Sequence, residues 1–229
     1  MSSFQYHPEI LKRYPNLVAG VITAHGLTNR PTPPELLDLY RAEQQTVIQR
    51  IGSTPLSQIE SLAAWRSVFR SFGVDPTQIR SACEALLRRL TKQGDIPSIN
   101  TLVDLGNLVS IRYAVPVAIL DTRAAANTIT VRLADGSERF TNLGQTEVDH
   151  PESDEVIFAD DSGLVFARRW CWRQSDESAA RNDTTDAIVT VEAHHASAAQ
   201  DVAAAVRDLT TLLPQYAHGE VTSTIISAK

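Results

Sequence analysis

Glu192 is the residue whose type and setting best suit chemistry. It lies in the segment VTVEAHH, which has the alternating pattern of an extended strand. This alternation places Val189 and Val191 on one face of the strand, and Thr190 and Glu192 on the other. A carboxylate on such a face accepts hydrogen bonds from a ligand. The alternative is an exposed strand carboxylate, because glutamates lie mostly on protein surfaces.

A second candidate is an aromatic cluster beside a cation. Two of the three tryptophans of the chain, Trp170 and Trp172, lie within three residues of each other, and Arg173 follows directly. This spacing predicts the aromatic wall of a pocket next to a guanidinium group. The alternative is a pair of core aromatics flanked by a solvated arginine.

Arginines gather in two further segments. One holds Arg80, Arg88 and Arg89 at helical spacing with Glu84, and the other includes Arg169. A surface ion pair between Glu84 and Arg88 would explain part of the first segment. The alternative is contact with phosphates, which suits the planar fork of arginine.

Other chemistries find little support in the chain. The one adjacent pair of histidines, His194 and His195, points to opposite faces of a strand, so no metal site is expected. No serine has the setting of a nucleophile elbow, and Cys83 lies in a helical pattern typical of a core. We expect no cofactor.

Composition indicates one ordinary folded domain. The chain has 229 residues, of which 43% are hydrophobic and 21% charged. No apolar run approaches the ~18 residues that cross a bilayer, and no secretory signal is recognisable. The two cysteines are too few for a disulfide framework. We therefore expect a cytoplasmic protein with reduced thiols.

The net charge of −6 argues against strong, non-specific binding of nucleic acid. The arginine segments are nevertheless separate from the acidic stretch at 147–161. Such segregation permits one basic surface that contacts nucleic acid weakly and transiently.

The elements that must position these residues follow from periodicity. Helices are predicted over 34–51, 58–71, 75–92, 97–113 and 196–216, and a buried strand lies in the apolar run LVAGVITAHGL. After Pro116 come short runs rich in β-formers: VAIL, NTITVRL, SERFTNL, EVIFAD, LVFARRWCW and DAIVTVEA. This order predicts the α+β class.

The helix predicted over 97–113 carries an unusual polar row. Asn100, Asp104 and Asn107 lie along one side of it. Either the row faces water, or it is a buried network that shapes a pocket. We interpret it mainly as scaffold, with Asn100 as the member that touches a ligand.

Five segments in a fixed order resemble a known family. They are WRSVFRSFGVDP (65–76), RSACEALLRR (80–89), IPSINTLVDLGNLVSIRYAVPVAILD (96–121), RRWCWR (168–173) and VTVEA (189–193). Together they resemble the editing domain of the bacterial phenylalanyl-tRNA synthetase β subunit, and the whole chain resembles free-standing copies of that domain better. The resemblance spans residues 10 to 225.

The resemblance implies a sandwich-like β core flanked by helices. It implies one editing-type domain over 1–229, with a helix-rich part (30–113), a strand-rich part (115–195) and a C-terminal helix (196–216). It also implies a stand-alone hydrolase that removes a wrong amino acid from the acceptor end of tRNA. No stable protein partner is implied, and the chain is expected to be a monomer.

The resemblance assigns roles to individual residues. Glu192 matches the glutamate that binds the side chain of the mischarged amino acid. Ala118 stands where the synthetase domain has a histidine, and the Trp172–Arg173 region stands where it has a glycine pair. The substrate pocket is therefore expected to hold Trp170, Trp172, Arg173, Asn100 and Ala118, and tRNA is expected to contact Arg80, Arg88, Arg89 and Arg169.

The edited amino acid stays open at this stage. The synthetase domain removes tyrosine, whereas one known activity of free-standing relatives is removal of canavanine from arginine tRNA. The altered residues argue against a copy of the tyrosine pocket, and canavanyl-tRNA(Arg) is favoured over tyrosyl-tRNA(Phe) or another mischarged tRNA. The rival interpretations are a non-catalytic tRNA-binding module and a small amino-acid-binding module.

Overall fold

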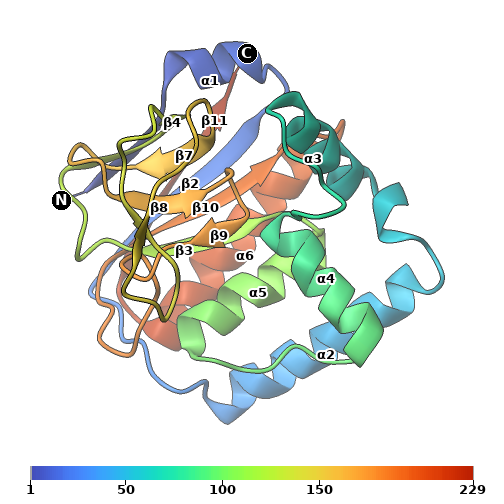
Figure 1. Cartoon of the computed structure of the whole chain (residues 1–229). Helices are drawn as coiled ribbons and strands as arrows, with labels where there is room; N and C mark the ends of the chain where they lie inside the picture. The colour runs from blue at the N-terminus through green and yellow to red at the C-terminus, as the bar shows by residue number, and fades with distance from the viewer. Residues whose placement is uncertain (1, 229) are drawn as a thin grey trace.

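Two main sheets build the centre of the protein (Figure 1). The computed structural model describes residues 2–228. The five-stranded sheet has the order β1 (Ser3–Tyr6), β4 (Thr128–Leu133), β7 (Val156–Ala159), β8 (Val165–Arg168) and β9 (Arg173–Gln174). The four-stranded sheet has the order β11 (Glu220–Ser227), β2 (Val18–His25), β10 (Ala187–Ala193) and β3 (Val117–Asp121). Strands β5 (Phe140–Thr141) and β6 (Val148–Asp149) form a separate two-stranded sheet.

Helices cover the sandwich. They are α1 (Pro8–Arg13), α2 (Pro34–Ile51), the 3₁₀ turn η1 (Leu56–Gln58), α3 (Glu60–Ser71), α4 (Ala82–Gln93), α5 (Thr101–Tyr113) and α6 (Ala198–Ala217). Apolar side chains of α2, α4, α5 and α6 share one core with the outer face of the four-stranded sheet. A second core lies between the two sheets and includes Ile10 of α1 and Trp65 of α3. The predicted α+β class, a sandwich-like β core flanked by helices, is confirmed.

Strand β10 lies at the centre of this arrangement and is buried along its whole length. Val189 and Val191 belong to the core on the helical side, whereas Ile188 belongs to the core between the sheets. The predicted alternation is therefore confirmed. It directs Glu192 into the space between the two sheets.

Four helices, α3, α4, α5 and α6, begin later than the periodicity predicts. Helix α4 starts at Ala82 rather than at Asp75, because Asp75 forms a local turn in which its carboxylate accepts from the backbone and hydroxyl of Thr77. The helix is instead capped by Ser81, whose hydroxyl accepts from the backbone N–H of Glu84. Helix α3 likewise starts at Glu60, after the separate turn η1.

Helix α5 starts at Thr101 because Asn100 caps it, with its side chain accepting from Val103 N at 3.0 Å. Asp104 in its first turn is fully buried and accepts from Thr32 Oγ1 at 2.6 Å, from Ile99 N at 2.9 Å and from Ser98. Most of the polar row is thus a buried network that anchors the start of the helix.

Three elements near the chain ends have no clear sequence signal. They are β1, α1 and β11. Strand β1 has four residues and pairs in parallel with β4, whose partner residues lie about 125 positions further along the chain. Strand β11 is mostly exposed and polar. Their pairing depends on distant strands, so a local pattern does not reveal it.

Candidate functional site

Glu192 lies at the end of β10 and is only 2% exposed. Its Oε1 accepts from the hydroxyl of Tyr6 at 2.5 Å and from Nε1 of Trp170 at 2.7 Å. The interpretation of Glu192 as an exposed strand carboxylate is therefore wrong. Tyr6 comes from β1, and nothing in its local sequence connects it with Glu192.

This setting changes the acidity of both groups. Burial raises the pKa of Glu192 to about 7, although the hydrogen bonds from Trp170 and Tyr6 oppose the shift. Burial, followed by the neighbouring Glu192 charge, raises the pKa of Tyr6 well above its ordinary value. Glu192 therefore exchanges its proton near neutral pH while Tyr6 stays a neutral donor.

Glu192 lines a small cavity of about 60 Å³. Four other residues predicted for the substrate pocket line the same cavity: Ala118, Trp170, Trp172 and Arg173. A space of this size is large enough for only a few water molecules. A larger ligand therefore requires side chains at the mouth to move.

The turn after β8 presents the two tryptophans to different surroundings. Arg169 and Trp170 both have left-handed backbone, with φ of 45° and 63°. The turn is held by Glu155, which accepts from Arg169 N at 2.9 Å, and by a bond from Trp170 N to Val156 O at 2.7 Å. Strained backbone of this kind persists only where its surroundings fix it, often at functional sites.

Trp170 is fully buried in an aromatic cluster. Its ring lies edge-on to Tyr14, Trp65 and His194, with ring centres 4.8, 5.4 and 5.2 Å away. Burial, and to a lesser degree His195, lowers the pKa of His194 to about 3, so that ring is neutral. The cluster fixes Trp170 as a rigid donor to Glu192.

Trp172 lies at the boundary between the cavity and a basic groove. Its ring carries the guanidinium of Arg169 at 4.7 Å and that of Arg173 at 4.6 Å. Trp172 and Arg173 also line a groove of about 430 Å³, together with Gln78, Arg80, Ala85, Arg88, Arg89, Lys92 and Gln93. The residues predicted for phosphate contact thus adjoin the cavity that holds Glu192.

The arginines that line this groove, and Arg66 beside Glu84, differ in whether they form ion pairs. Arg66 donates to both oxygens of the buried Glu84, at 3.0 and 2.5 Å, and Arg80 approaches the same carboxylate at 3.8 Å. The predicted surface pair of Glu84 with Arg88 is therefore wrong. Within residues 2–228, Arg88 and Arg89 form no ion pair, which leaves their charge to the groove.

Asn100 does not line the cavity of Glu192. Besides capping α5, it donates from Nδ2 to Ala180 O at 3.0 Å. Both functional groups of its side chain are thus used in the scaffold, and its predicted ligand contact has no place in this cavity.

Cys171 lines the cavity, although the sequence pattern did not single it out. Burial, and then the nearby Glu192, raise the pKa of Cys171 well above its ordinary value. A thiol in that state is a weak nucleophile. Cys83 is buried in the core, as its helical pattern predicts.

Two negative findings concern the described residues only. Among residues 2–228, no group of three or more histidine, cysteine, aspartate or glutamate side chains is arranged to hold a metal ion. Across the same residues, every helix is too short or too polar to span a bilayer.

Comparison with known proteins identifies related chains. Residues 64–217 match the family model of the B3/4 domain. The phenylalanine–tRNA ligase beta subunit of Shewanella oneidensis is 30% identical over 89 residues, which cover 39% of this chain and 11% of that protein. The corresponding subunit of Aster yellows witches'-broom phytoplasma is 28% identical over 144 residues, which cover 61% of this chain and 16% of that protein.

The solved structures include an N-terminal fragment of the phenylalanyl-tRNA synthetase beta subunit from Pyrococcus horikoshii. It has a TM-score of 0.49 and 12% identity, over 96% of this chain and 50% of that fragment. The chain spans less than a fifth of the two curated relatives. The family model, however, matches more than half of the chain, in agreement with the resemblance in the sequence motifs. The chain therefore belongs to the B3/4 domain family.

Proposed function

We propose that this protein hydrolyses the ester bond between a wrong amino acid and tRNA after a synthetase has released the product. The observation that carries the proposal is the sharing of Trp172 and Arg173 between the Glu192 cavity and the basic groove. A tRNA-related role also agrees with the named relatives, which are subunits of a tRNA ligase.

The groove suits the acceptor end of tRNA. Arg88, Arg89 and Lys92 supply positive charge along one side, and Arg80 and Arg173 lie next to them. Guanidinium groups bind phosphate through paired hydrogen bonds. In this proposal the phosphates of the terminal nucleotides lie in the groove, with Arg169 beside Trp172 at its end, and the aminoacyl group enters the cavity.

The cavity must open for this to happen. Its present volume of about 60 Å³ is too small for an amino acid, so the half-buried Trp172 and the exposed Arg173 are the side chains expected to swing aside. Trp170 cannot move in this way, because it is enclosed by aromatic rings. Ala118 also lines the cavity, and its small side chain takes up little of the space.

The reaction needs only water and a well-placed ester. Water oxygen bonds to the carbonyl carbon, the bond from that carbon to the ribose oxygen breaks, and a water proton ends on the ribose oxygen. Holding the reactants in position supplies much of such an acceleration. We assign Glu192 to bind the amino acid and to help place the water, with the adjacent ribose hydroxyl and backbone groups assisting.

Canavanine is the amino acid that the site suits best in our proposal. Tyr6 and Trp170 both donate to Oε1 of Glu192, which leaves Oε2 to accept from the N–H groups of a guanidino head. Canavanine has an oxygen in place of a methylene of arginine, and its head group is less basic. A polar site of this kind discriminates by unmatched hydrogen bonds better than an apolar site does by size.

The test is deacylation of a panel of mischarged tRNAs, including canavanyl-tRNA(Arg) and tyrosyl-tRNA(Phe). Wild type should cleave canavanyl-tRNA(Arg) fastest, and Glu192→Gln should reduce the rate by about tenfold or more. Glu9→Gln on the exposed side of α1 is the matched control. If no ester is cleaved faster than in buffer, the hydrolase proposal fails.

The deacylation panel, together with binding measurements on uncharged tRNA and free amino acids, separates the other interpretations. Preferred cleavage of tyrosyl-tRNA(Phe) or another ester would keep the hydrolase and replace its substrate. Binding of uncharged tRNA without cleavage would indicate a tRNA-binding module. Binding of a free amino acid in the Glu192 cavity alone would indicate a small-molecule module.

A further inference from the structure

The three tryptophans of the chain are held in different ways. Trp65 and Trp170 are buried, and their indole N–H groups donate to Glu192, at its backbone oxygen (3.3 Å) and at its Oε1 (2.7 Å). Trp172 is half-buried, and within residues 2–228 its indole N–H has no hydrogen-bond partner. Its ring also packs on no other aromatic ring of these residues. Trp172 therefore belongs neither to the aromatic cluster nor to the donors that hold Glu192.

Positive charge lies against the ring of Trp172. The guanidinium of Arg169 is 4.7 Å from the ring centre, and that of Arg173 is 4.6 Å from it. Arg169 is half-buried, and its side chain comes within 3.9 Å of the carboxylate of Glu155. Arg173 is exposed and donates to Asn142 Oδ1 over a longer distance of 3.3 Å. Arg173 is therefore the side chain that can leave the ring for a phosphate, and its departure uncovers part of the indole.

The position of this ring suits a nucleotide base. Trp172 lines both the Glu192 cavity and the basic groove, and among the described residues that line the groove it alone has an aromatic ring. The ribose that carries the ester also carries the base of the last nucleotide, so that base must lie near the mouth of the cavity. Aromatic side chains bind unpaired bases by stacking.

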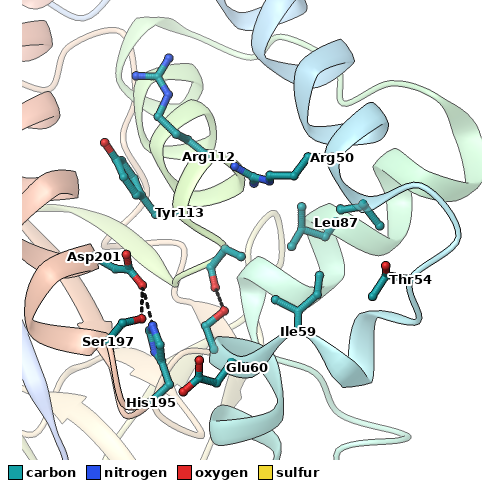
Figure 2. A pocket seen from close by; sticks show the side chains of 13 residues that line it. Arg50, Thr54, Ile59, Glu60, Leu87, Arg112, Tyr113, His195, Ser197 and Asp201 are labelled. Atoms are coloured by element: carbon teal, nitrogen blue, oxygen red, sulfur yellow. Dashed lines mark hydrogen bonds and ion pairs between the residues drawn. The ribbon is translucent and has the colours of Figure 1, made fainter.

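A larger cavity among the helices does not offer this arrangement. Its volume is about 490 Å³, and Glu60, Tyr113 and Asp201 are among the residues that line it (Figure 2). No residue that lines it also lines the Glu192 cavity or the basic groove. A base joined to a ribose at the mouth of the Glu192 cavity therefore has its place at Trp172 and not among the helices.

We propose that the ring of Trp172 stacks on the base of the terminal adenosine of tRNA. Arg173 moves from the ring to a phosphate in the groove, which suits its paired N–H groups. The ribose then lies over the mouth of the cavity, and the aminoacyl group points toward Glu192. This inference rests on the proposed deacylation and assigns to Trp172 the task of positioning its substrate.

The test compares two forms of uncharged tRNA(Arg), one intact and one whose last nucleotide keeps its phosphate and ribose but lacks the base. Fluorescence anisotropy of labelled tRNA at low salt measures both Kd values. Wild type should bind the intact form about tenfold more tightly, as expected for one stacked base. Trp172→Leu should lose this difference, and Trp172→Phe should keep most of it. Arg88→Ala should weaken binding of both forms by the same factor, because a phosphate contact does not depend on the base.

A second readout follows the ring itself. Stacking on a base quenches tryptophan emission, and the other two tryptophans are buried. Intact tRNA should therefore quench the emission of wild type more than the form without the base does, and Trp172→Phe should abolish this difference. Circular dichroism checks that each variant folds. If Trp172→Leu does not, the emission of wild type and Trp172→Phe decides.

Three results would overturn the inference. They are equal binding of the two forms by wild type, a difference that persists in Trp172→Leu, and emission that both forms quench equally. The absence of measurable binding of intact tRNA would overturn it as well. Deacylation is a separate measurement. Cleavage together with equal binding of the two forms would defeat the stacking alone, whereas base-dependent binding without cleavage would defeat the hydrolase alone.

Discussion

At the scale of single residues, Glu192 is defined by what surrounds its carboxyl group. Two rigid donors hold one oxygen, and burial between the sheets raises its pKa to about 7. The group can therefore change charge within the range of pH in which cells work. Two measurable consequences follow, one for the rate of hydrolysis and one for stability.

The first prediction concerns the pH dependence of deacylation. If the ionised carboxyl binds the amino acid and places water, kcat/KM should rise with pH through about 7, where half of the carboxyl groups are deprotonated, and level off about one pH unit higher. Glu192→Gln should lose this rise as well as most of the rate. A wild-type profile that stays flat from pH 5.5 to 8, after correction for hydrolysis in buffer, would contradict the role given to the carboxylate.

The second prediction concerns stability. The folded pKa of Glu192, about 7, lies above the ordinary 4.5, so the native state holds its proton more tightly than the unfolded state. Between these values the contribution of Glu192 to the free energy of unfolding should fall as pH rises, by a total of about 3 kcal/mol. The Glu192→Gln variant has no titrating group at this position, so its free energy of unfolding should not show this fall. Urea unfolding at pH 4.5 and 7.5 measures both proteins. The free energy of unfolding of the variant, relative to that of wild type, should be higher at pH 7.5 than at pH 4.5.

At the scale of elements, caps decide where the helices begin. Ser81 is buried at the N-terminus of α4, and its hydroxyl accepts from Glu84 N at 3.3 Å. The same helix carries Arg88 and Arg89 into the groove, so its starting point determines where these charges lie.

The third prediction tests this cap. Ser81→Ala should lower the free energy of unfolding by about 1 kcal/mol, because the capped N–H loses its partner. Ser67→Ala, at an exposed position within α3, should change it by less than about 0.5 kcal/mol. Urea unfolding of both variants measures the difference, and equal effects would show that the cap is not responsible.

Elements with strong local signals were predictable from the sequence. Helix α2 has the predicted bounds because Pro34 opens it and apolar residues recur at helical spacing. Asp75 was misleading, since a proline after an aspartate favours a turn as readily as a helix start. For the site, the alternation in β10 correctly placed Glu192 on the face opposite Val189 and Val191, but it did not show that this face is buried too. Tyr6 is 186 positions away from Glu192, and no local pattern links the two.

At the scale of the whole molecule, charge is distributed unevenly. The net charge is −6, yet Arg80, Arg88, Arg89, Lys92 and Arg173 line one groove. Binding of tRNA through that groove should therefore be weak overall and sensitive to salt, because each neutralised phosphate releases counterions.

The fourth prediction follows from this distribution. Arg88→Ala should weaken binding of uncharged tRNA and reduce the slope of log K against log salt by about 0.7 to 0.9, the share of one phosphate contact. Arg13→Ala is the control. It removes a positive charge at the exposed end of α1, and Arg13 does not line the groove. Fluorescence anisotropy at several salt concentrations measures both slopes. If both variants reduce the slope equally, binding of tRNA depends only on the net charge of the protein and not on the groove.

The parallel pairing of β1 with β4 has a consequence for how the site comes into being. It brings Tyr6 to Glu192, so the first strand and the tenth must both be present before the carboxyl has both donors. During synthesis from the N-terminus, Tyr6 is made long before Glu192, and the hydrogen bond between them can form only after most of the chain has been synthesised. The family match begins only at residue 64. A fragment trimmed to that match would keep Glu192 and Trp170 but lose the phenol of Tyr6, and with it β2, the strand that pairs with β10 along its whole length.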